Sequence, residues 1–508
     1  MSSLRACGVI LHPTSLPGRF GIGDLGGEAY RFADFLKAAG QSLWQVLPLG
    51  PTGYGDSPYQ CFSAFAGNPL LISPERMVEA GLLPAEELAG WPAFPAERVD
   101  YGALIPHKLA LLHRAAHRLE ARGPAQLQRA FADFCAAQAG WLDDYALFMA
   151  LKDAHNGAPW FEWEAELAAR RPAALARWRE GLAGAILAHR FMQFEFFRQW
   201  GALKAYVNAQ GIRIMGDLPI FVAHDSADVW AHPELFYLDA AGRPMAVAGV
   251  PPDYFSETGQ LWGNPLYRWE RMAEEGYAWW IARLQASLRL MDVVRLDHFR
   301  GFEAYWEVPA DESTAVNGRW VPGPGASLFE ALRAALGPLP IVAEDLGVIT
   351  PAVEALRDQF GFPGMRVLQF GFASDAGNPH LPHNWVRNCV AYVGTHDNDT
   401  AAGWYARIGD TPEGHYARRY LACDGRDIAW DMIRAVMSSV ADTAMYMAQD
   451  LLSLGNEARM NYPSRPGGNW VWRCRAGALD ERVAARLRQM AEDYGRLPAT
   501  AAPADSLG

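Results

Sequence analysis

The sequence contains few cysteines for its length, and their spacing indicates none of the common cysteine-dependent sites. Six cysteines are spread over 508 residues. None of them forms a Cys-x-x-Cys pair, and none lies in a cluster with histidines. Because disulfide frameworks and zinc sites both need such groupings, neither is predicted.

Long apolar runs and an excess of positive charge are also absent. No stretch of about 18 apolar residues could span a bilayer, and the first residues lack the apolar region of a signal peptide. The formal net charge is −12, which disfavours binding to nucleic acid or to an anionic membrane, since both are polyanions. We therefore expect a cytoplasmic protein with neither partner. The sequence contains no signal for an oligomeric state.

No Gly-x-Gly-x-x-Gly motif follows a predicted strand, which disfavours a dinucleotide-binding fold.

The sequence is rich in apolar and aromatic residues: 50% of its residues are hydrophobic, 12% are aromatic and only 20% are charged. This composition is typical of a globular protein with a large core. Aromatic rings stack on sugars as well as filling cores, and composition alone predicts the core role for most of them.

Strand-like and helix-like segments alternate over much of the chain. Strands are predicted at 8–12, 42–47, 212–217, 292–296, 341–344, 365–371, 390–394 and 443–448. Helices are predicted at 28–39, 267–290, 326–336, 351–360 and 428–440. About eight strands, most of them followed by a helix, favour an α/β fold of the (β/α)8 TIM-barrel type over an open sheet.

The alternation is lost between residues 61 and 208. Segments rich in Ala, Leu, Arg and Glu predict helices over 106–150 and 160–208. We therefore predict a barrel formed by residues 1–60 and 209–495, with residues 61–208 as an inserted, mainly helical subdomain. The tail, residues 496–508, is rich in Ala, Pro, Ser and Asp and is predicted to be disordered.

Four acidic residues stand where predicted strands give way to loops. Asp297, Glu344 and Asp397 each follow a short apolar run, and Asp217 has an equivalent place. In a parallel barrel the carboxyl ends of the strands open on the active-site face. Acids collected there from separate strands are what glycosidic-bond chemistry needs.

The neighbours of two of these acids predict different ionisation states. Arg295 and Asp297 lie two apart on a strand and therefore point to one face. The guanidinium would lower the pKa of Asp297 and keep it ready as a nucleophile, although the two could also be a structural ion pair. Glu344 follows three apolar residues, so its pKa would be raised, as a general acid requires. Alone, it could also be a solvated acid at a strand end.

Other interpretations of the polar residues stay open on the sequence alone. The polar cluster at residues 395–400 could bind sugar hydroxyls or cap the next helix. Asp217, Asp297 and Glu344 could ligate Mg²⁺ in a metal-dependent barrel enzyme. A non-catalytic glucan-binding protein would also have an aromatic-rich cleft.

Several longer segments carry a family resemblance. They are Gly216–Ile220, Gly249–Pro265, Arg295–Phe302, Ala343–Gly347, Gly394–Thr400 and Arg459–Asn461. Together they resemble the amylomaltase family, the 4-α-glucanotransferases that form glycoside hydrolase family 77 of the α-amylase clan. The matching segments run in order from about residue 8 to residue 473, nearly the whole chain.

The resemblance implies a role for each position that matches. Asp297 matches the catalytic nucleophile, Glu344 the general acid/base, and Asp397 a third catalytic acid that holds the donor sugar. Further positions that match sugar-contacting residues are Arg295, His396, Asp217, Ser57, Tyr59, His298 and Asn461. A segment near 247–265 resembles a flexible lid loop over the acceptor side, from which Phe255, Gln260 and Trp262 would contact sugar. Tyr54 and Tyr101 resemble a second glucan-binding patch, remote from the cleft.

The reaction that the resemblance implies is a retaining transfer. Segments of α-1,4-glucan would pass from a donor to the 4-hydroxyl of an acceptor through a covalent glycosyl-enzyme, with neither a metal nor another cofactor. Maltooligosaccharides and α-1,4-glucans would serve as donor and acceptor. An α-1,4-glucan hydrolase using the same residues is the alternative.

Overall fold

Eight short parallel strands form the centre of the molecule. The computed structural model describes residues 5–252, 256–463, 465 and 467–498. The strands of the central sheet are β1 (Ala6–Ile10), β2 (Leu43–Gln45), β3 (Arg213–Pro219), β6 (Val293–Asp297), β9 (Ile341–Ala343), β10 (Gly364–Val367), β11 (Cys389–Tyr392) and β12 (Thr443–Met447). Their order is β10-β11-β12-β1-β2-β3-β6-β9. The amide of Ala343 donates to the carbonyl of Pro363, just before β10 (2.9 Å), and so joins the two edges into a barrel.

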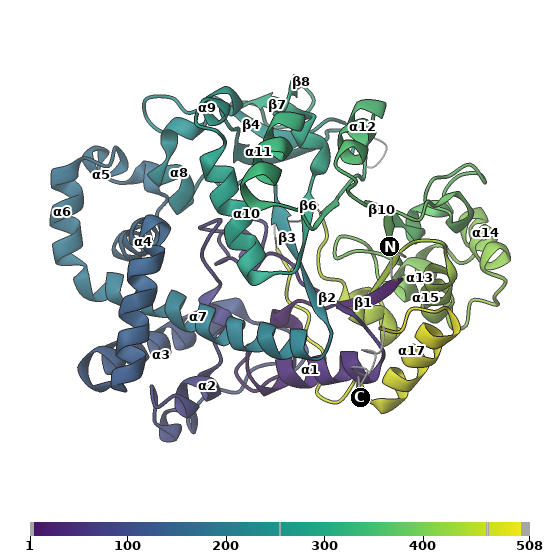
Figure 1. Cartoon of the computed structure of the whole chain (residues 1–508), viewed down its shortest axis with the longest axis horizontal. Helices are drawn as coiled ribbons and strands as arrows, with labels where there is room; N and C mark the ends of the chain where they lie inside the picture. The colour runs from purple at the N-terminus through teal and green to yellow at the C-terminus, as the bar shows by residue number, and fades with distance from the viewer. Residues whose placement is uncertain (1–4, 253–255, 464, 466, 499–508) are drawn as a thin grey trace, which may run out of the picture.

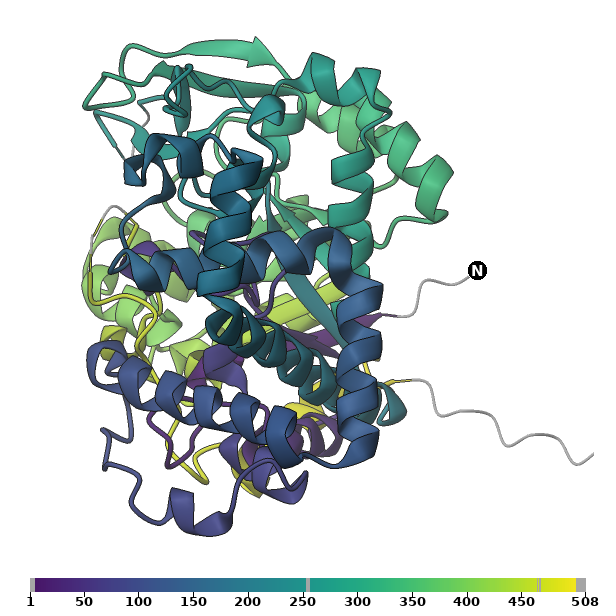
Figure 2. The ribbon, with the colours of Figure 1, turned by 90° about the vertical axis from the view of Figure 1, so that its left-hand side faces the viewer.

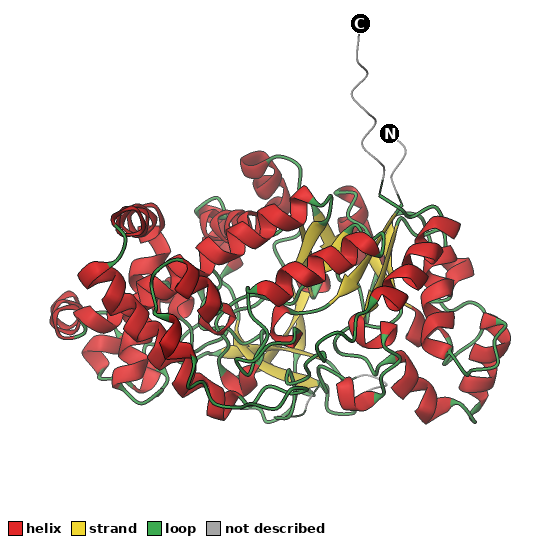
Figure 3. Cartoon of the chain, turned by 90° about the horizontal axis from the view of Figure 1, so that it is seen from below, coloured by secondary structure: helices red, strands yellow, loops and turns green. Residues whose placement is uncertain are grey.

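Helices surround these strands on all sides (Figure 1, Figure 3). Along the chain they are α1 (Gly27–Ala38), α2 (Pro74–Glu79), α3 (Tyr101–Arg122), α4 (Ala125–Ala154), α5 (Ala165–Ala168), α6 (Pro172–Gly181), α7 (Ala183–Ala209), α8 (Ala227–Ala231), α9 (Trp269–Glu274), α10 (Ala278–Leu290), α11 (Ala326–Leu336), α12 (Pro351–Gln359), α13 (Ala401–Ile408), α14 (Pro412–Leu421), α15 (Ile428–Ser438), α16 (Ala448–Leu451) and α17 (Glu481–Asp493). Helix α10 packs against β3 and β6, and α15 packs against β12. The predicted (β/α)8 barrel is therefore confirmed.

Alternation along the strands decides which side chains enter the barrel. On β6, Val293 packs with apolar residues of the other strands inside the barrel. Val294 and Leu296 pack outward, in the larger core beneath the helices. Arg295 and Asp297 share a face with Val293, because residues two apart on a strand point the same way. The strand thus carries its two charged side chains into the barrel, at the carboxyl end.

Between β2 and β3 the chain leaves the barrel and forms a group of helices on one side (blue in Figure 1, towards the viewer in Figure 2). Helices α3 and α4 pack against α7, and α7 also packs against α1 and β3. The last helix of this segment therefore covers the barrel wall as well as the helical group. The predicted boundary at 208 falls at the end of α7, and the division into subdomains stays a prediction.

A second, antiparallel sheet occupies part of the segment near 247–265, where a lid loop was predicted. Its strands, in spatial order, are β5 (Gln260–Pro265), β4 (Ala246–Val250), β7 (Ala304–Pro309) and β8 (Arg319–Pro322). Gly249 permits the close pairing of β4 and β5, because a Cβ atom there would lie 2.5 Å from the carbonyl oxygen of Gln260. Strands β4 and β5 thus occupy residues 246–250 and 260–265 of this segment, and the lid over the acceptor side stays a prediction.

The first residues of the tail that was predicted to be disordered pack against the barrel, and the disorder of the rest stays a prediction. Arg496 is buried, and its guanidinium donates to the carbonyl oxygens of Met437 (2.7 Å), Ala441 (2.9 Å) and Ala6 (2.9 Å). These bonds tie the chain to the base of the barrel beyond α17, whereas residues 499–508 lie outside the described residues. Among the helices that are described, none is long and apolar enough to cross a membrane.

Candidate active site

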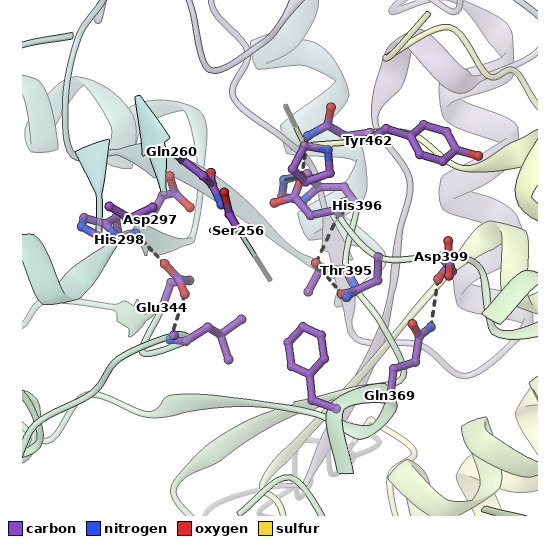
Figure 4. Close-up of a pocket in the computed structure, with 18 of the residues that line it drawn as sticks. Ser256, Gln260, Asp297, His298, Glu344, Gln369, Thr395, His396, Asp399 and Tyr462 are labelled. Atoms are coloured by element: carbon purple, nitrogen blue, oxygen red, sulfur yellow. Dashed lines mark hydrogen bonds and ion pairs between the residues drawn. The ribbon is translucent and has the colours of Figure 1, made fainter. Parts of the chain in front are cut away.

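A cleft of about 1690 Å³ opens at the carboxyl ends of the barrel strands. Its walls come from the loop after β2, from the β4–β5 hairpin, from the ends of β6, β9, β10 and β11, and from residues 459–470. Asp297, Glu344 and Asp397 all line it. In Figure 4, Asp297 and Glu344 lie on one side of this cleft, and His396 lies on the other. Three of the four strand-end acids therefore meet in one cavity.

The register of β3, β6 and β9 sets the positions of the acids. Asp217 on β3 pairs with Arg295 on β6, and Leu296 on β6 pairs with Ala343 on β9. Glu344 directly follows that second pair, and its amide donates to the carbonyl of Leu296 (3.0 Å). Because neighbouring strands lie about 4.8 Å apart, side chains from these three strands come into contact across the barrel mouth.

Arg295 binds two carboxylates through one nitrogen atom. Its Nη1 donates to Oδ1 of Asp297 (2.9 Å) and to Oδ2 of Asp217 (2.7 Å). Burial lowers the pKa of the Arg295 guanidinium, but Asp217 and Asp297 outweigh that effect and leave it raised. At this distance the cation stabilises negative charge on Asp297, which is the form that can act as a nucleophile.

Asp217 lies behind the residues that line the cleft, and its contact with sugar stays a prediction. Its side chain is buried, and Oδ2 accepts a hydrogen bond from the hydroxyl of Tyr59 (2.9 Å) besides the one from Arg295. Burial raises the pKa of Asp217, while Arg295 acts in the opposite direction. Since Arg295 and Tyr59 both line the cleft, any effect of Asp217 on a ligand passes through them.

Glu344 has surroundings unlike those of Asp297. Its carboxyl group is buried and accepts the backbone N–H of His298 at Oε2 (2.7 Å) and that of Leu346 at Oε1 (2.9 Å). Burial raises the pKa of Glu344, Arg295 lowers it, and the negative charge of Asp297 raises it again. The net result is a raised pKa, which favours the protonated form that a general acid needs.

His298 follows Asp297 with a left-handed backbone (φ 52°). Such a conformation is uncommon outside glycine and occurs often at functional sites. Its ring meets Trp262 edge-on, with ring centroids 4.8 Å apart. Burial lowers the pKa of His298 to about 4, so the ring is neutral. Its buried Nε2 has no hydrogen-bond partner in the part of the chain that the structure describes, which leaves it available to a ligand.

Asp397 is held on the other side of the cleft. Asn461 donates from Nδ2 to Oδ1 of Asp397 (2.7 Å), and Nε2 of His396 lies 3.3 Å from the same oxygen. Burial lowers the pKa of His396. The His396 ring stacks on Tyr59 with centroids 5.1 Å apart and planes inclined by 15°. A flat aromatic wall therefore stands beside this carboxylate.

The remaining predicted residues of the cleft lie on the β4–β5 hairpin and in the loop after β2. Gln260 and Trp262, both on β5, line the cleft, and Trp262 Nε1 donates to Gln260 Oε1 (3.1 Å). Ser57 also lines the cleft, and its Oγ accepts the backbone N–H of Tyr59 (3.2 Å). Phe255 belongs to residues 253–255, which lie outside the described residues.

The second glucan-binding patch at Tyr54 and Tyr101 stays a prediction, and the structure places the two tyrosines differently. Tyr54 is 79% exposed, but it lies at the cleft itself. Tyr101 is only 7% exposed, and its hydroxyl donates to the carbonyl of Trp470 (3.0 Å). Its ring is packed in an apolar cluster.

Several polar and aromatic residues of the cleft were not predicted from the sequence. Arg459 donates to the backbone oxygen of Asp397 and to Oδ1 of Asp399 (both 2.5 Å), and Gln369 donates to the backbone oxygen of Asp399 (2.9 Å). Arg459 and Asp399 stand inside segments used for the family resemblance, which could have identified them. Trp470 also lines the cleft, but no strand or helix pattern surrounds it in the sequence.

Asp217, Asp297 and Glu344 hydrogen-bond to donors of the protein itself. Arg295 binds Asp217 and Asp297, while backbone amides bind Glu344. In the described part of the chain, no three histidine, cysteine, aspartate or glutamate side chains are grouped so that they could hold a metal ion. A Mg²⁺ site formed by Asp217, Asp297 and Glu344 would therefore have to displace the guanidinium.

Comparison with known proteins gives consistent matches over nearly the whole chain. Residues 11–479 match the model of glycoside hydrolase family 77, described as 4-alpha-glucanotransferase. The 4-alpha-glucanotransferase of Thermus thermophilus is 56% identical over 97% of this chain and 99% of its own, and that of Synechocystis is 53% identical over 98% and 99%. The amylomaltase of Streptococcus agalactiae, solved in complex with acarbose, has a TM-score of 0.94 and is 41% identical, covering 97% of this chain and 99% of its own. The chain therefore belongs to the 4-α-glucanotransferases of glycoside hydrolase family 77.

Proposed function

We propose that this protein is a retaining 4-α-glucanotransferase in which Asp297 is the nucleophile and Glu344 the general acid/base. The observation that carries the proposal is the contrast between two carboxyl groups in one cleft. Asp297 lies against the Arg295 guanidinium, whereas Glu344 is buried with a raised pKa. Environments that separate two acids in this way assign one as the ionised group and the other as the proton donor.

In the first half-reaction the Asp297 carboxylate attacks the anomeric carbon of the donor sugar. The glycosidic bond breaks, and Glu344 gives its proton to the leaving glucan oxygen. The product is a covalent glycosyl-enzyme with inverted configuration. Its formation removes the negative charge of Asp297, which leaves Arg295 paired with Asp217 and prevents an unpaired cation in the barrel.

In the second half-reaction Glu344 acts as a base. It takes the proton from the 4-hydroxyl of an acceptor sugar, and that oxygen attacks the anomeric carbon while the bond to Asp297 breaks. The second inversion restores the α-linkage. Transfer prevails over hydrolysis when an acceptor sugar occupies the cleft and keeps water away from the intermediate. We assign this exclusion of water to Trp262 and His298, whose rings are in contact beside Asp297.

Asp397 and the wall of Tyr59 and His396 serve to bind the donor sugar. A carboxylate held by Asn461 can accept hydrogen bonds from sugar hydroxyls, and the neighbouring rings offer an apolar surface to a sugar face. Maltooligosaccharides and α-1,4-glucans are the substrates that fit a long, open cleft of this kind. That the Streptococcus agalactiae amylomaltase was solved in complex with acarbose supports a sugar as the ligand of this fold.

Incubation of the protein with maltotriose tests the proposal. A glucanotransferase produces glucose together with oligomers longer than maltotriose, and it does so equally well after exhaustive chelation of metal ions. Glucose and maltose without longer products would identify a hydrolase. Activity lost on chelation and restored by Mg²⁺ would identify a metal-dependent enzyme, and no product at all would identify a binding protein.

A further inference from the structure

Trp470 has a strained backbone next to the proposed donor site. Its φ angle is 63°, a left-handed conformation that is a genuine outlier for so bulky a side chain. The residue is 5% exposed and lines the cleft. Strained residues of this kind persist only where surrounding bonds enforce them, and they concentrate at functional sites.

The ring of Trp470 contacts both rings of the donor-site wall. Its centroid lies 5.8 Å from that of Tyr59 and 5.8 Å from that of His396, with planes inclined by 41° and 38°. Tyr59 also donates to Asp217 (2.9 Å), and His396 lies beside Asp397. A displacement of Trp470 would therefore move Tyr59 and His396, and with them their contacts to Asp217 and Asp397.

Two hydrogen bonds fix the backbone of Trp470 directly. Its N–H donates to the carbonyl of Met460 (2.7 Å), and its own carbonyl accepts the hydroxyl of Tyr101 (3.0 Å). Around them, residues 97–101 and 470–473 run antiparallel. The amide of Val99 donates to Val471 (2.7 Å), and that of Arg473 donates to Glu97 (2.8 Å).

Tyr101 is itself held rigidly. It is the first residue of α3, whose N-cap Asp100 accepts the amide of Ala103 (3.1 Å). Its ring packs in an apolar cluster with Ile22 and Leu104. A tyrosine hydroxyl in such surroundings needs hydrogen-bond partners; it donates to the carbonyl of Trp470, and the side chain of Thr14 hydrogen-bonds it as well. Helix α3 thus reaches the active site through one side chain.

We propose that Tyr101 is a positioning residue for the donor site. Its hydroxyl holds the strained backbone of Trp470, and the Trp470 ring holds Tyr59 and His396 in the orientation that binds the sugar before the scissile bond. The helices between β2 and β3 would then contribute to catalysis through this contact. The inference rests on the donor-site role proposed above for Tyr59 and His396.

This role differs from that of a remote glucan-binding residue in a measurable way. A positioning residue affects the reaction of every donor, however short, because the site that it orders is always used. A remote patch affects only glucans long enough to reach it from the cleft. A donor as short as maltotriose therefore separates the two roles.

The test compares Tyr101→Phe with wild type and with Tyr446→Phe. Tyr101→Phe keeps the packed ring and removes only the hydroxyl. Tyr446→Phe is the matched control, because it removes another buried tyrosine hydroxyl, one that donates to Gln41 Oε1 away from the cleft. Transfer from maltotriose and from long amylose is measured with glucose as acceptor. Hydrogen exchange of peptides spanning residues 467–474 reports on the Trp470 amide.

We expect Tyr101→Phe to lower kcat by about three- to tenfold with both donors, the range that loss of one buried hydrogen bond allows. The KM for the glucose acceptor should stay unchanged, and the Trp470 peptide should exchange faster. Tyr446→Phe should match wild type in kcat even if its Tm falls as much as that of Tyr101→Phe. A Tyr101→Phe defect confined to amylose, unchanged kcat with maltotriose, or an equal loss in Tyr446→Phe would overturn the proposal.

The outcome is independent of the nucleophile assignment. If Asp297→Asn retained full transfer, the proposed nucleophile would be wrong, whatever hydrogen exchange at Trp470 showed in Tyr101→Phe. If Asp297→Asn is inactive while Tyr101→Phe behaves as wild type with maltotriose, only the positioning role fails.

Discussion

Two walls of the cleft are constructed in different ways. The side that carries Asp297 and Glu344 consists of barrel strand ends, where Arg295 on β6 binds Asp217 on β3 and Glu344 accepts the backbone N–H of His298. The side that carries Gln260 and Trp262 is formed by β4 and β5 of a separate antiparallel sheet. Bond cleavage needs charges fixed relative to one another, whereas the choice between sugar and water as acceptor needs only a surface that binds sugar. We expect chemistry to depend on the first side and selectivity on the second.

Asp297→Asn should have the largest effect, because it alters the chemistry on the strand-end side of the cleft. The amide keeps the size of the carboxylate and can still contact Arg295, but it cannot attack the anomeric carbon. We expect transfer and hydrolysis both to fall by several orders of magnitude, as after loss of other nucleophiles. Product analysis from maltotriose measures the loss, and circular dichroism establishes that the fold is intact. Substantial residual transfer in a folded variant would refute the assignment.

Glu344→Gln should have the next largest effect. The amide can neither protonate the leaving glucan nor accept a proton from the acceptor, so both half-reactions should slow by roughly 10²–10⁴-fold. A glycosyl fluoride needs no acid for departure and should restore the first half-reaction selectively. Stopped-flow measurement of fluoride release checks this, and equal impairment with both kinds of donor would contradict the role.

The burial of Glu344 also predicts a pH-dependent cost to stability. Its pKa in the folded protein is raised above the ordinary value of 4.5, so the folded state binds this proton more tightly than the unfolded state does. The stabilisation from this group is therefore present below pH 4.5 and is lost as the pH rises through the folded pKa.

Glu344→Gln cannot ionise, so its free energy of unfolding should rise relative to wild type as the pH increases above 4.5. Thermal unfolding of both proteins across this range measures the difference. A difference in Tm that does not change with pH would mean that Glu344 is not buried with a raised pKa.

Trp262→Ala should have the smallest effect on rate and the clearest effect on selectivity. Loss of its aromatic surface should weaken acceptor binding by about two- to tenfold and raise the ratio of hydrolysis to transfer. Leu261→Ala is the matched control, because Leu261 precedes it on β5 and points to the opposite face of the hairpin. Equal ratios in the two variants would show that Trp262 does not determine the acceptor.

Sequence analysis predicted the barrel side better than the hairpin side. Strands such as β6 and β9 are apolar runs buried on both faces, so an acid at their end stands out, and Asp297 and Glu344 were identified in this way. The β4–β5 hairpin contains Gly and Pro residues, and β4 pairs with β7, more than 50 positions away in the sequence. No local pattern contains that information.

Asp217 and Tyr101 are two residues whose contacts could not be predicted from their positions in the sequence. Asp217 was predicted at a strand end like Asp297, but β3 continues to Pro219, and Asp217 pairs with Arg295, two residues before the level of Asp297 and deeper in the barrel. Tyr101 was predicted in a glucan-binding patch remote from the cleft, whereas its hydroxyl donates to a backbone oxygen 369 residues later. In both cases the role follows from a long-range contact that only the fold creates.

The most direct test of the account is to locate the covalent intermediate. Glu344→Gln, incubated with an α-maltosyl fluoride, should accumulate a maltosyl adduct because turnover of the intermediate is slowed. Proteolysis and mass spectrometry should place that adduct on the peptide containing Asp297. An adduct on another carboxylate, or fluoride release with no adduct at any time, would contradict the claim that Asp297 is the nucleophile of a retaining transferase.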